Sequence, residues 1–185
     1  MLSQPSLPAA GQILLGMLSV TAAIWDLRFR RIPNWLVLAG IFSGVASNVL
    51  ESGWLGLGTA AEGLGLGFAL YFPLFLLRAR GAGDVKLLAA IGSITGPANC
   101  FWIFLLTALL GGVIGLVLVA ARGRVHKTFA NIAVIMRDLT QFRAPFRTSQ
   151  ELDVKTTRGM RLPHGAILVA GVAAFLVIAQ RGIRI

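Results

Sequence analysis

Residues 100–121 read CFWIFLLTALLGGVIGLVLVAA, a run of 22 residues without a charged side chain. A helix rises about 1.5 Å per residue, so this run spans about 33 Å, close to the roughly 30 Å hydrocarbon core of a bilayer. The whole chain is similarly apolar, because 56% of its 185 residues are hydrophobic, 13% are charged, and its mean hydropathy is +0.79. Roughly a quarter of an ordinary soluble domain is charged. The sequence therefore predicts an integral membrane protein.

Outward from this run, further apolar stretches occur on both sides. They cover residues 9–25, 35–50, 57–77, 85–94 and 162–180. The stretch at 85–94 is too short to cross a membrane, so its ends should lie inside the protein, where neighbours or water satisfy the backbone. We expect an all-α bundle of about six transmembrane helices. One of them is short, and all belong to a single polytopic domain over residues 1–185.

The chain carries 17 Lys and Arg against 7 Asp and Glu, a net charge of +10. The basic residues are confined to segments between apolar stretches, so no nucleic-acid partner is expected. Segments 28–31, 78–86 and 122–161 hold fifteen of the seventeen, whereas Arg181 and Arg184 fall on the other side of the predicted bundle. Because basic loops remain in the cytoplasm, these three segments should be cytoplasmic and both termini extracytoplasmic.

The basic loop at 122–161 contains an amphipathic pattern. Phe129, Ile132, Met136 and Leu139 recur at helical spacing opposite polar residues. Such a helix can lie on the cytoplasmic membrane surface, with the bilayer as its partner, or pack against the protein's own cytoplasmic face. Neither interpretation makes the segment catalytic.

The single cysteine and the composition of residues 1–10 bear on disulfides, metal sites and signal peptides. Cys100 is the only cysteine, so an internal disulfide or a zinc site is not expected, and we predict a packed structural thiol without a metal or cofactor. Residues 1–10 contain no Lys or Arg, so the basic start of a secretory signal peptide is missing and the first apolar stretch should remain as a helix.

Glycine is frequent, with 22 residues, and several recur at helical spacing inside apolar stretches. In lipid, small residues let helices approach closely, and this explains the pattern better than a nucleotide-binding loop does. The glycines concerned are Gly40, Gly44, Gly63, Gly65, Gly67, Gly92 and Gly96.

Two of the seven acidic residues, Asp26 and Asp84, lie directly against apolar stretches. An ionisable group at membrane depth costs roughly 2.5 to 3.5 kcal/mol on insertion scales, which makes it a candidate functional residue. Alternatively, Asp26 pairs with Arg28 or Arg30, and Asp84 caps a helix N-terminus. The two aspartates are 58 positions apart with two predicted spans between them, so both should lie at the same membrane face.

Two carboxylates that meet in a partly dry pocket do not both ionise easily, so one holds a proton while the other is charged. One can then take a proton from water while the other protonates the carbonyl or the leaving amine of a peptide. This chemistry needs neither a metal nor a covalent intermediate.

Residues 81–84 read GAGD, and residues 26–34 read DLRFRRIPN. Here the chain resembles the prepilin peptidases, bacterial membrane aspartyl peptidases marked by a Gly-x-Gly-Asp motif and by an upstream Asp followed six or seven residues later by Ile-Pro-Asn. Residues 161–166, RLPHGA, look like the family's C-terminal Pro-containing segment. The resemblance covers most of the chain and implies that Asp26 and Asp84 form the catalytic dyad.

Other motif residues are expected to position the substrate: Gly81, Gly83, Lys86, Pro33, Asn34 and Pro163. Gly81 and Gly83 leave room for a substrate strand beside Asp84, and Pro33 suits the first turn of a helix. Lys86 balances the charge of the dyad or binds substrate, or is a snorkelling surface lysine. His164 fits an interfacial or capping role better than that of a general base.

Long prepilin peptidases also carry paired Cys-x-x-Cys motifs in a cytoplasmic insertion and methylate the new pilin N-terminus. With Cys100 alone, this chain resembles the short form of the Flp-type (Tad) pili, so methyl transfer is not predicted. The resemblance implies cleavage of prepilin leader peptides at the cytoplasmic face of the bacterial inner membrane. A small transporter and a non-catalytic pilus-assembly subunit remain the alternatives, and the oligomeric state is open.

Overall fold

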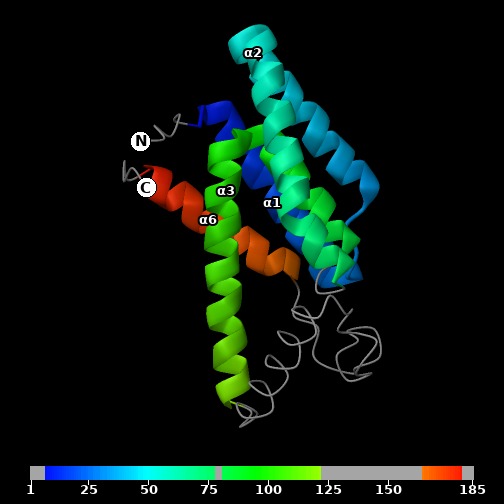
Figure 1. Cartoon of the computed structure of the whole chain (residues 1–185), viewed down its shortest axis with the longest axis vertical. Coiled ribbons are helices and arrows are strands. Elements are labelled where there is room, and N and C mark those ends of the chain that lie inside the picture. Colours follow the sequence, from blue (N-terminus) through cyan, green and yellow to red (C-terminus); the bar gives the residue numbers. More distant parts are fainter. Residues whose placement is uncertain (1–6, 78–80, 122–163, 181–185) are drawn as a thin grey trace, which may run out of the picture.

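The computed structural model describes residues 7–77, 81–121 and 164–180, and every regular element in these ranges is a helix (Figure 1). In chain order the helices are α1 (Ala9–Phe29), α2 (Asn34–Leu76), α3 (Ala82–Ala121) and α6 (His164–Gln180). By length and composition α1, α2 and α3 can each cross a membrane, whereas the apolar part of α6 is shorter. The described part of the chain is therefore all-α, with apolar helices suited to a bilayer, and the number of crossings stays a prediction.

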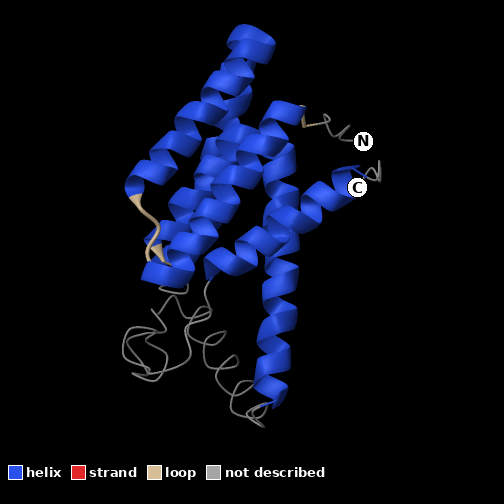
Figure 2. Cartoon of the chain, turned by 180° about the vertical axis from the view of Figure 1, so that it is seen from behind, coloured by secondary structure: helices blue, strands red, loops and turns tan. Residues whose placement is uncertain are grey.

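Two glycines interrupt the long helices. Gly53 in α2 has φ 59° and ψ −134°, and Gly96 in α3 has φ 75° and ψ 173° and is followed by Pro97. Glycine reaches positive φ at little cost because it has no Cβ. The breaks fall in the gaps between the apolar stretches predicted at 35–50 and 57–77 and at 85–94 and 100–121. The two halves of α2 fold back on each other at the break (Figures 1 and 2).

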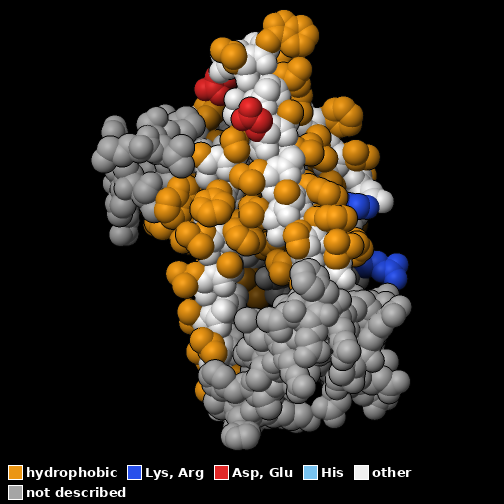
Figure 3. All heavy atoms as spheres, viewed as in Figure 1, with side chains coloured by type: hydrophobic (Ala, Val, Ile, Leu, Met, Phe, Trp, Pro, Cys, Tyr) orange, Lys and Arg blue, Asp and Glu red, His pale blue; other side chains and the backbone are white. Residues whose placement is uncertain are grey.

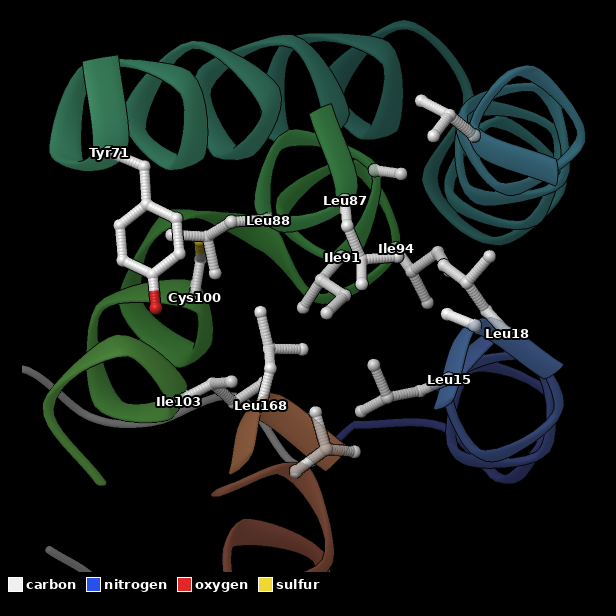
Figure 4. Close-up of a cluster of buried hydrophobic side chains, with 14 of the residues drawn as sticks. Leu15, Leu18, Tyr71, Leu87, Leu88, Ile91, Ile94, Cys100, Ile103 and Leu168 are labelled. Carbon is white, nitrogen blue, oxygen red and sulfur yellow. The ribbon is translucent and has the colours of Figure 1, made fainter. Parts of the chain in front are cut away.

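The first half of α3, from Ala82 to the break, is the centre of the bundle. Almost every residue from Val85 to Gly96 is buried, and the prediction that the ends of the 85–94 stretch lie inside the protein is confirmed, since Val85 and Ile94 are both buried. Figure 4 shows its leucine and isoleucine side chains meeting residues of every other described helix. The labelled members of this core are Leu15, Leu18, Tyr71, Leu87, Leu88, Ile91, Ile94, Cys100, Ile103 and Leu168.

Glycines let the two halves of α2 close around α3. Gly63 and Gly92 face each other so closely that a Cβ on either would meet the backbone carbonyl of the other, and a Cβ at Gly67 would lie 2.5 Å from the carbonyl oxygen of Leu88. The predicted close approach is confirmed at Gly40, Gly44, Gly63, Gly67, Gly92 and Gly96. The prediction is wrong for Gly65, where a Cβ would have no neighbour within 4 Å.

The described Lys and Arg residues all lie at one end of the bundle. The basic residues lie at the end where α1 stops and α2 and α3 start, and Glu51 lies beside the Gly53 break at the opposite end. Figure 3 shows acidic side chains near the top, Lys and Arg lower down at the right edge, and apolar side chains over the surface between them. The described basic residues are Arg28, Arg30, Arg31 and Lys86.

Aromatic side chains mark the same two ends. The Trp25 ring lies 5.3 Å from that of Phe29 and 5.8 Å from that of Trp35, all at the basic end, and Trp54 is 87% exposed beside the Gly53 break. Trp and Tyr concentrate where a membrane meets water, so two such levels fit the predicted orientation of the helices across a bilayer. Several predictions lie outside the described residues, namely the 122–161 loop with its amphipathic pattern, Arg78, Arg80 and Pro163.

Candidate active site

Four helix ends converge at the basic end of the bundle, toward the lower right of Figure 1. The end of α1 meets the start of α6, where the Gly165 N–H donates to Asp26 Oδ2 over 2.9 Å. The connection between α1 and α2, tan in Figure 2, meets the start of α3, where a Cβ on Gly83 would lie 3.4 Å from Ile32 Cβ. These contacts bring the segments that carry Asp26 and Asp84 to one end of the bundle.

Asp26 lies in the last turn of α1 and is partly buried. The helix continues past the predicted end of the apolar stretch at residue 25 and stops at Phe29. Arg30 then takes a left-handed conformation, with φ 53° and ψ 32°, and its N–H donates to the Asp26 backbone carbonyl over 2.8 Å. Within the described residues the Asp26 carboxylate bonds to α6, and not to Arg28 or Arg30 as the alternative interpretation supposed.

Asp84 is the third residue of α3 and is also partly buried. Its backbone N–H donates to the Gly81 carbonyl over 3.1 Å, and a Cβ on Gly81 would lie 3.8 Å from Asp84 Oδ2. Since α3 begins at Ala82, Asp84 lies inside the first turn and not at the capping position, so the proposed N-cap is wrong. In the first turn the helix dipole favours a negative side chain.

The two motif glycines differ in their surroundings. Gly81 is exposed, and Asp84 is the only neighbour that a Cβ there would meet within 4 Å, so this side of Asp84 is open among the described residues. At Gly83 a Cβ would make ordinary contact with Ile32, so on this side Gly83 borders the chain itself, and the room expected there for a substrate strand stays a prediction. Gly83 does not have positive φ.

Lys86 and Asn34 form a hydrogen-bonded pair that was not predicted from the sequence. The exposed Lys86 Nζ donates to Asn34 Oδ1 over 3.1 Å, which links the start of α3 to the start of α2. Pro33 is the residue just before α2 and not part of its first turn, with φ −70° and ψ 141°. Its carbonyl accepts the N–H groups of Leu36 and Val37 at 3.2 and 3.4 Å.

Two contacting residues were not singled out from the sequence. Gly165 is buried and holds the Asp26 carboxylate, and Ile32 fills the space beside Gly83. Both belong to the quoted motifs, since Ile32 precedes Pro33 and Gly165 follows His164, the first residue of α6. Their positions along the chain do not indicate these partners, since Gly165 and Asp26 are 139 positions apart.

Metal-ligating side chains do not cluster in the described part of the chain, where no group of three or more His, Cys, Asp or Glu residues is placed to hold an ion. Cys100 is fully buried in the core next to Gly92, which agrees with a packed thiol.

A family model described as the type IV leader peptidase family matches residues 13–116, just over half of the 185 residues. The matched range contains Asp26 and Asp84 and ends before α6 begins.

Curated relatives are named prepilin leader peptidase/N-methyltransferase. The protein from Xanthomonas campestris pv. campestris is 28% identical over 125 residues, which cover 64% of this chain and 43% of the relative. Those from Aeromonas salmonicida and Aeromonas hydrophila are each 32% identical over 117 residues, which cover 60% of this chain and 40% of the relative. The matches thus span less than half the length of these relatives, and no solved structure matches the chain.

Proposed function

The chain belongs to the type IV leader peptidase family, and on that premise we propose that it cleaves the leader peptides of prepilins with Asp26 and Asp84 as an aspartyl dyad. The observation that carries the proposal is that both aspartates, each partly buried, belong to segments that meet at one end of an apolar bundle. Aspartyl chemistry needs two carboxylates that share a proton in a restricted environment.

The proposed mechanism divides the work between the two carboxylates. The ionised one accepts a proton from water as the water attacks the peptide carbonyl, and the protonated one gives its proton to the carbonyl oxygen or the leaving amine. The Asp26 carboxylate accepts the Gly165 N–H, and Asp84 lies in the first turn of α3, where the helix dipole favours a negative side chain. Gly81 adds no side chain next to Asp84, which among the described residues leaves room for an extended substrate there.

The position of the aspartates supports hydrolysis over ion transport. Carboxylates that relay ions lie deep within membrane spans or at helices broken near the midplane. Here the aspartates lie in the last turn of α1 and the first turn of α3, at the end that also carries the described basic residues. Water for hydrolysis is available there without a channel.

The substrate follows from the family resemblance. A prepilin carries a short basic leader with a glycine before the cut and an apolar helix after it. The apolar helix can remain in the bilayer beside the exposed apolar faces of this bundle while the leader reaches the dyad. We place the enzyme in the bacterial inner membrane, with the dyad at the cytoplasmic face and both termini extracytoplasmic.

We further propose that this chain is a peptidase without methyltransferase activity, of the kind that serves Flp-type (Tad) pili. The curated relatives are named for both activities. Cysteine pairs mark the longer enzymes that methylate, whereas the only cysteine of this chain is buried in α3. Mass spectrometry of the mature pilin should therefore show a free, unmethylated N-terminal amine.

The test is cleavage of a tagged prepilin by the full chain and by its Asp26→Asn and Asp84→Asn variants. Each amide keeps the size of the carboxylate but can neither accept the proton of water nor cycle it, so each should lower kcat by at least about 1000-fold. The double variant should be little worse than either single variant, because the two residues act as one unit. Glu51→Gln is the matched control, since Glu51 is an exposed carboxylate at the opposite end.

Substantial cleavage by either folded single variant would reject the dyad. Cleavage should also persist when EDTA removes divalent metals, because the proposed mechanism uses two carboxylates to activate water. Loss of cleavage with EDTA and its return with zinc would instead require a metal enzyme.

A further inference from the structure

We propose that Gly165 is a positioning residue for Asp26, and that its amide and its missing side chain together fix the orientation of the Asp26 carboxylate. The inference rests on the proposed function and adds to it a residue outside the range matched by the family model, which ends at residue 116. It makes α6 a functional part of the site, not only a helix of the bundle.

The first support is the hydrogen bond itself. The Gly165 N–H donates to Asp26 Oδ2 over 2.9 Å, and the donor belongs to the second residue of α6. Amides in the first turn of a helix have no partner within the helix, so they are available to bond a carboxylate. A hydrogen bond to a charged acceptor is also shorter and stronger than one between neutral groups.

The second support is steric. A Cβ on Gly165 would lie 2.7 Å from Asp26 Oδ2, 2.8 Å from its Cβ and 3.0 Å from its Cγ. These distances involve three of the four heavy atoms of the Asp26 side chain, Cβ included, so a larger residue at position 165 must displace it. The contact contrasts with Gly83, where the nearest atom to a Cβ would be 3.4 Å away and an alanine would fit.

The packing of α6 prevents the helix from moving aside. Ile167, Leu168, Val172 and Phe175 are buried against α1 and α3. Because α6 is held along this buried face, the Asp26 side chain has to rotate if position 165 gains a Cβ, and its bond to the amide is then lost. A misplacement of about 1 Å at a reacting group can cost about 100-fold in rate.

Gly171 offers a matched control on the same helix. A Cβ there would meet the side chain of Thr107, and the contact is away from Asp26. Gly165→Ala and Gly171→Ala therefore make the same chemical change at close contacts of α6, the contact at Gly171 being the tighter one, and both should lower thermal stability. Only Gly165→Ala should alter the geometry of the dyad.

The experiment measures kcat and KM for prepilin cleavage by the two variants in detergent or vesicles. We expect Gly165→Ala to lower kcat about 100-fold with KM within about threefold of wild type, because substrate binding is retained and orientation is lost. Gly171→Ala should keep kcat within about threefold. Equal losses of kcat in the two variants would overturn the inference and leave Gly165 as a packing residue.

A second measurement does not depend on activity or on the folding of Gly165→Ala. In protein labelled with 15N-glycine, the Gly165 amide resonance should shift when Asp26 is replaced by alanine and stay unchanged in Glu51→Gln. An amide that does not respond would overturn the inference even if Asp26→Asn abolishes cleavage. Conversely, a wild-type chain that does not cleave prepilin would reject the proposed function while the hydrogen bond is still tested.

Discussion

At the residue scale, Arg30 is unusual because it is the one non-glycine residue with positive φ in the described part of the chain. A left-handed conformation costs an L-residue roughly 1 to 2 kcal/mol, and helices commonly end on glycine for this reason. Here an arginine takes that position just after α1, and its N–H bonds to the Asp26 carbonyl. The basic charge expected in this loop is thus kept at a cost in backbone strain.

We therefore predict that Arg30→Gly raises the free energy of unfolding by up to about 1 kcal/mol, since relief of strain exceeds the added freedom of the unfolded chain. Thermal unfolding in detergent should show a higher melting temperature. Arg31→Gly is the control, because Arg31 does not have positive φ and the same change there should destabilise slightly. A lower melting temperature for Arg30→Gly than for Arg31→Gly would contradict the account.

The sequence predicted which aspartates belong to the site but not which residues pair there, and the reason is physical. Asp26 and Asp84 stand out because a charged side chain beside an apolar run is costly and visible in the sequence. The pairing of Lys86 with Asn34 and of Gly165 with Asp26 depends on how helices dock, and no local pattern encodes it. Asp84 also lies within the first turn of its helix, because α3 begins two residues earlier than the aspartate.

At the scale of elements, the break in α3 is stabilised from α2. Pro97 has no N–H, so the Ser93 carbonyl four residues earlier lacks its helical donor. Asn48 Nδ2 donates to the carbonyl oxygens of Ser93 at 3.0 Å and Ile94 at 3.2 Å. One amide side chain thus supplies donors to carbonyls that the break leaves open, which matters where water is scarce.

We predict that Asn48→Leu lowers the free energy of unfolding by at least about 2 kcal/mol, because buried carbonyls lose their donor at about 1 to 3 kcal/mol each. Asn48→Asp should be no better, since a carboxylate keeps the size but donates nothing when ionised. Ser43→Ala is the control, because the Ser43 hydroxyl donates only to a carbonyl of its own helix, that of Gly40. Equal melting temperatures for Asn48→Leu and Ser43→Ala would refute the role.

The gaps between the predicted apolar stretches indicated where α2 and α3 are interrupted. They did not indicate the backbone geometry of these breaks. Residues 51–56 and 95–99 were recognisable as interruptions because polar or helix-breaking residues occur there. That α2 folds back at Gly53 to enclose α3 depends on tertiary contacts of Gly63, Gly67 and Gly92. The small-residue pattern predicted close packing without specifying which helices pack together.

At the scale of the whole molecule, charge and aromatic side chains orient the bundle. The basic end contains the connection around Arg31, and the opposite end contains the Gly53 break with Glu51 beside it. The first half of α2 runs between them over 34–52, about 28 Å at 1.5 Å per residue, close to the thickness of the hydrocarbon core. It is therefore long enough to cross the membrane by itself.

We predict that Arg31 lies on the cytoplasmic side and Ser52 on the outside, so that the dyad faces the cytoplasm. The chain allows a direct test, because its only cysteine, Cys100, is buried and should give little background labelling. In intact cells a membrane-impermeant maleimide should label Ser52→Cys and not Arg31→Cys, whereas in inverted vesicles the pattern should reverse. Labelling of both positions from one side would show that the first half of α2 does not cross the membrane. Labelling of Arg31→Cys from outside would place the dyad on the wrong face for a leader that remains in the cytoplasm, and the proposed cleavage of prepilins at that face would then have to be abandoned.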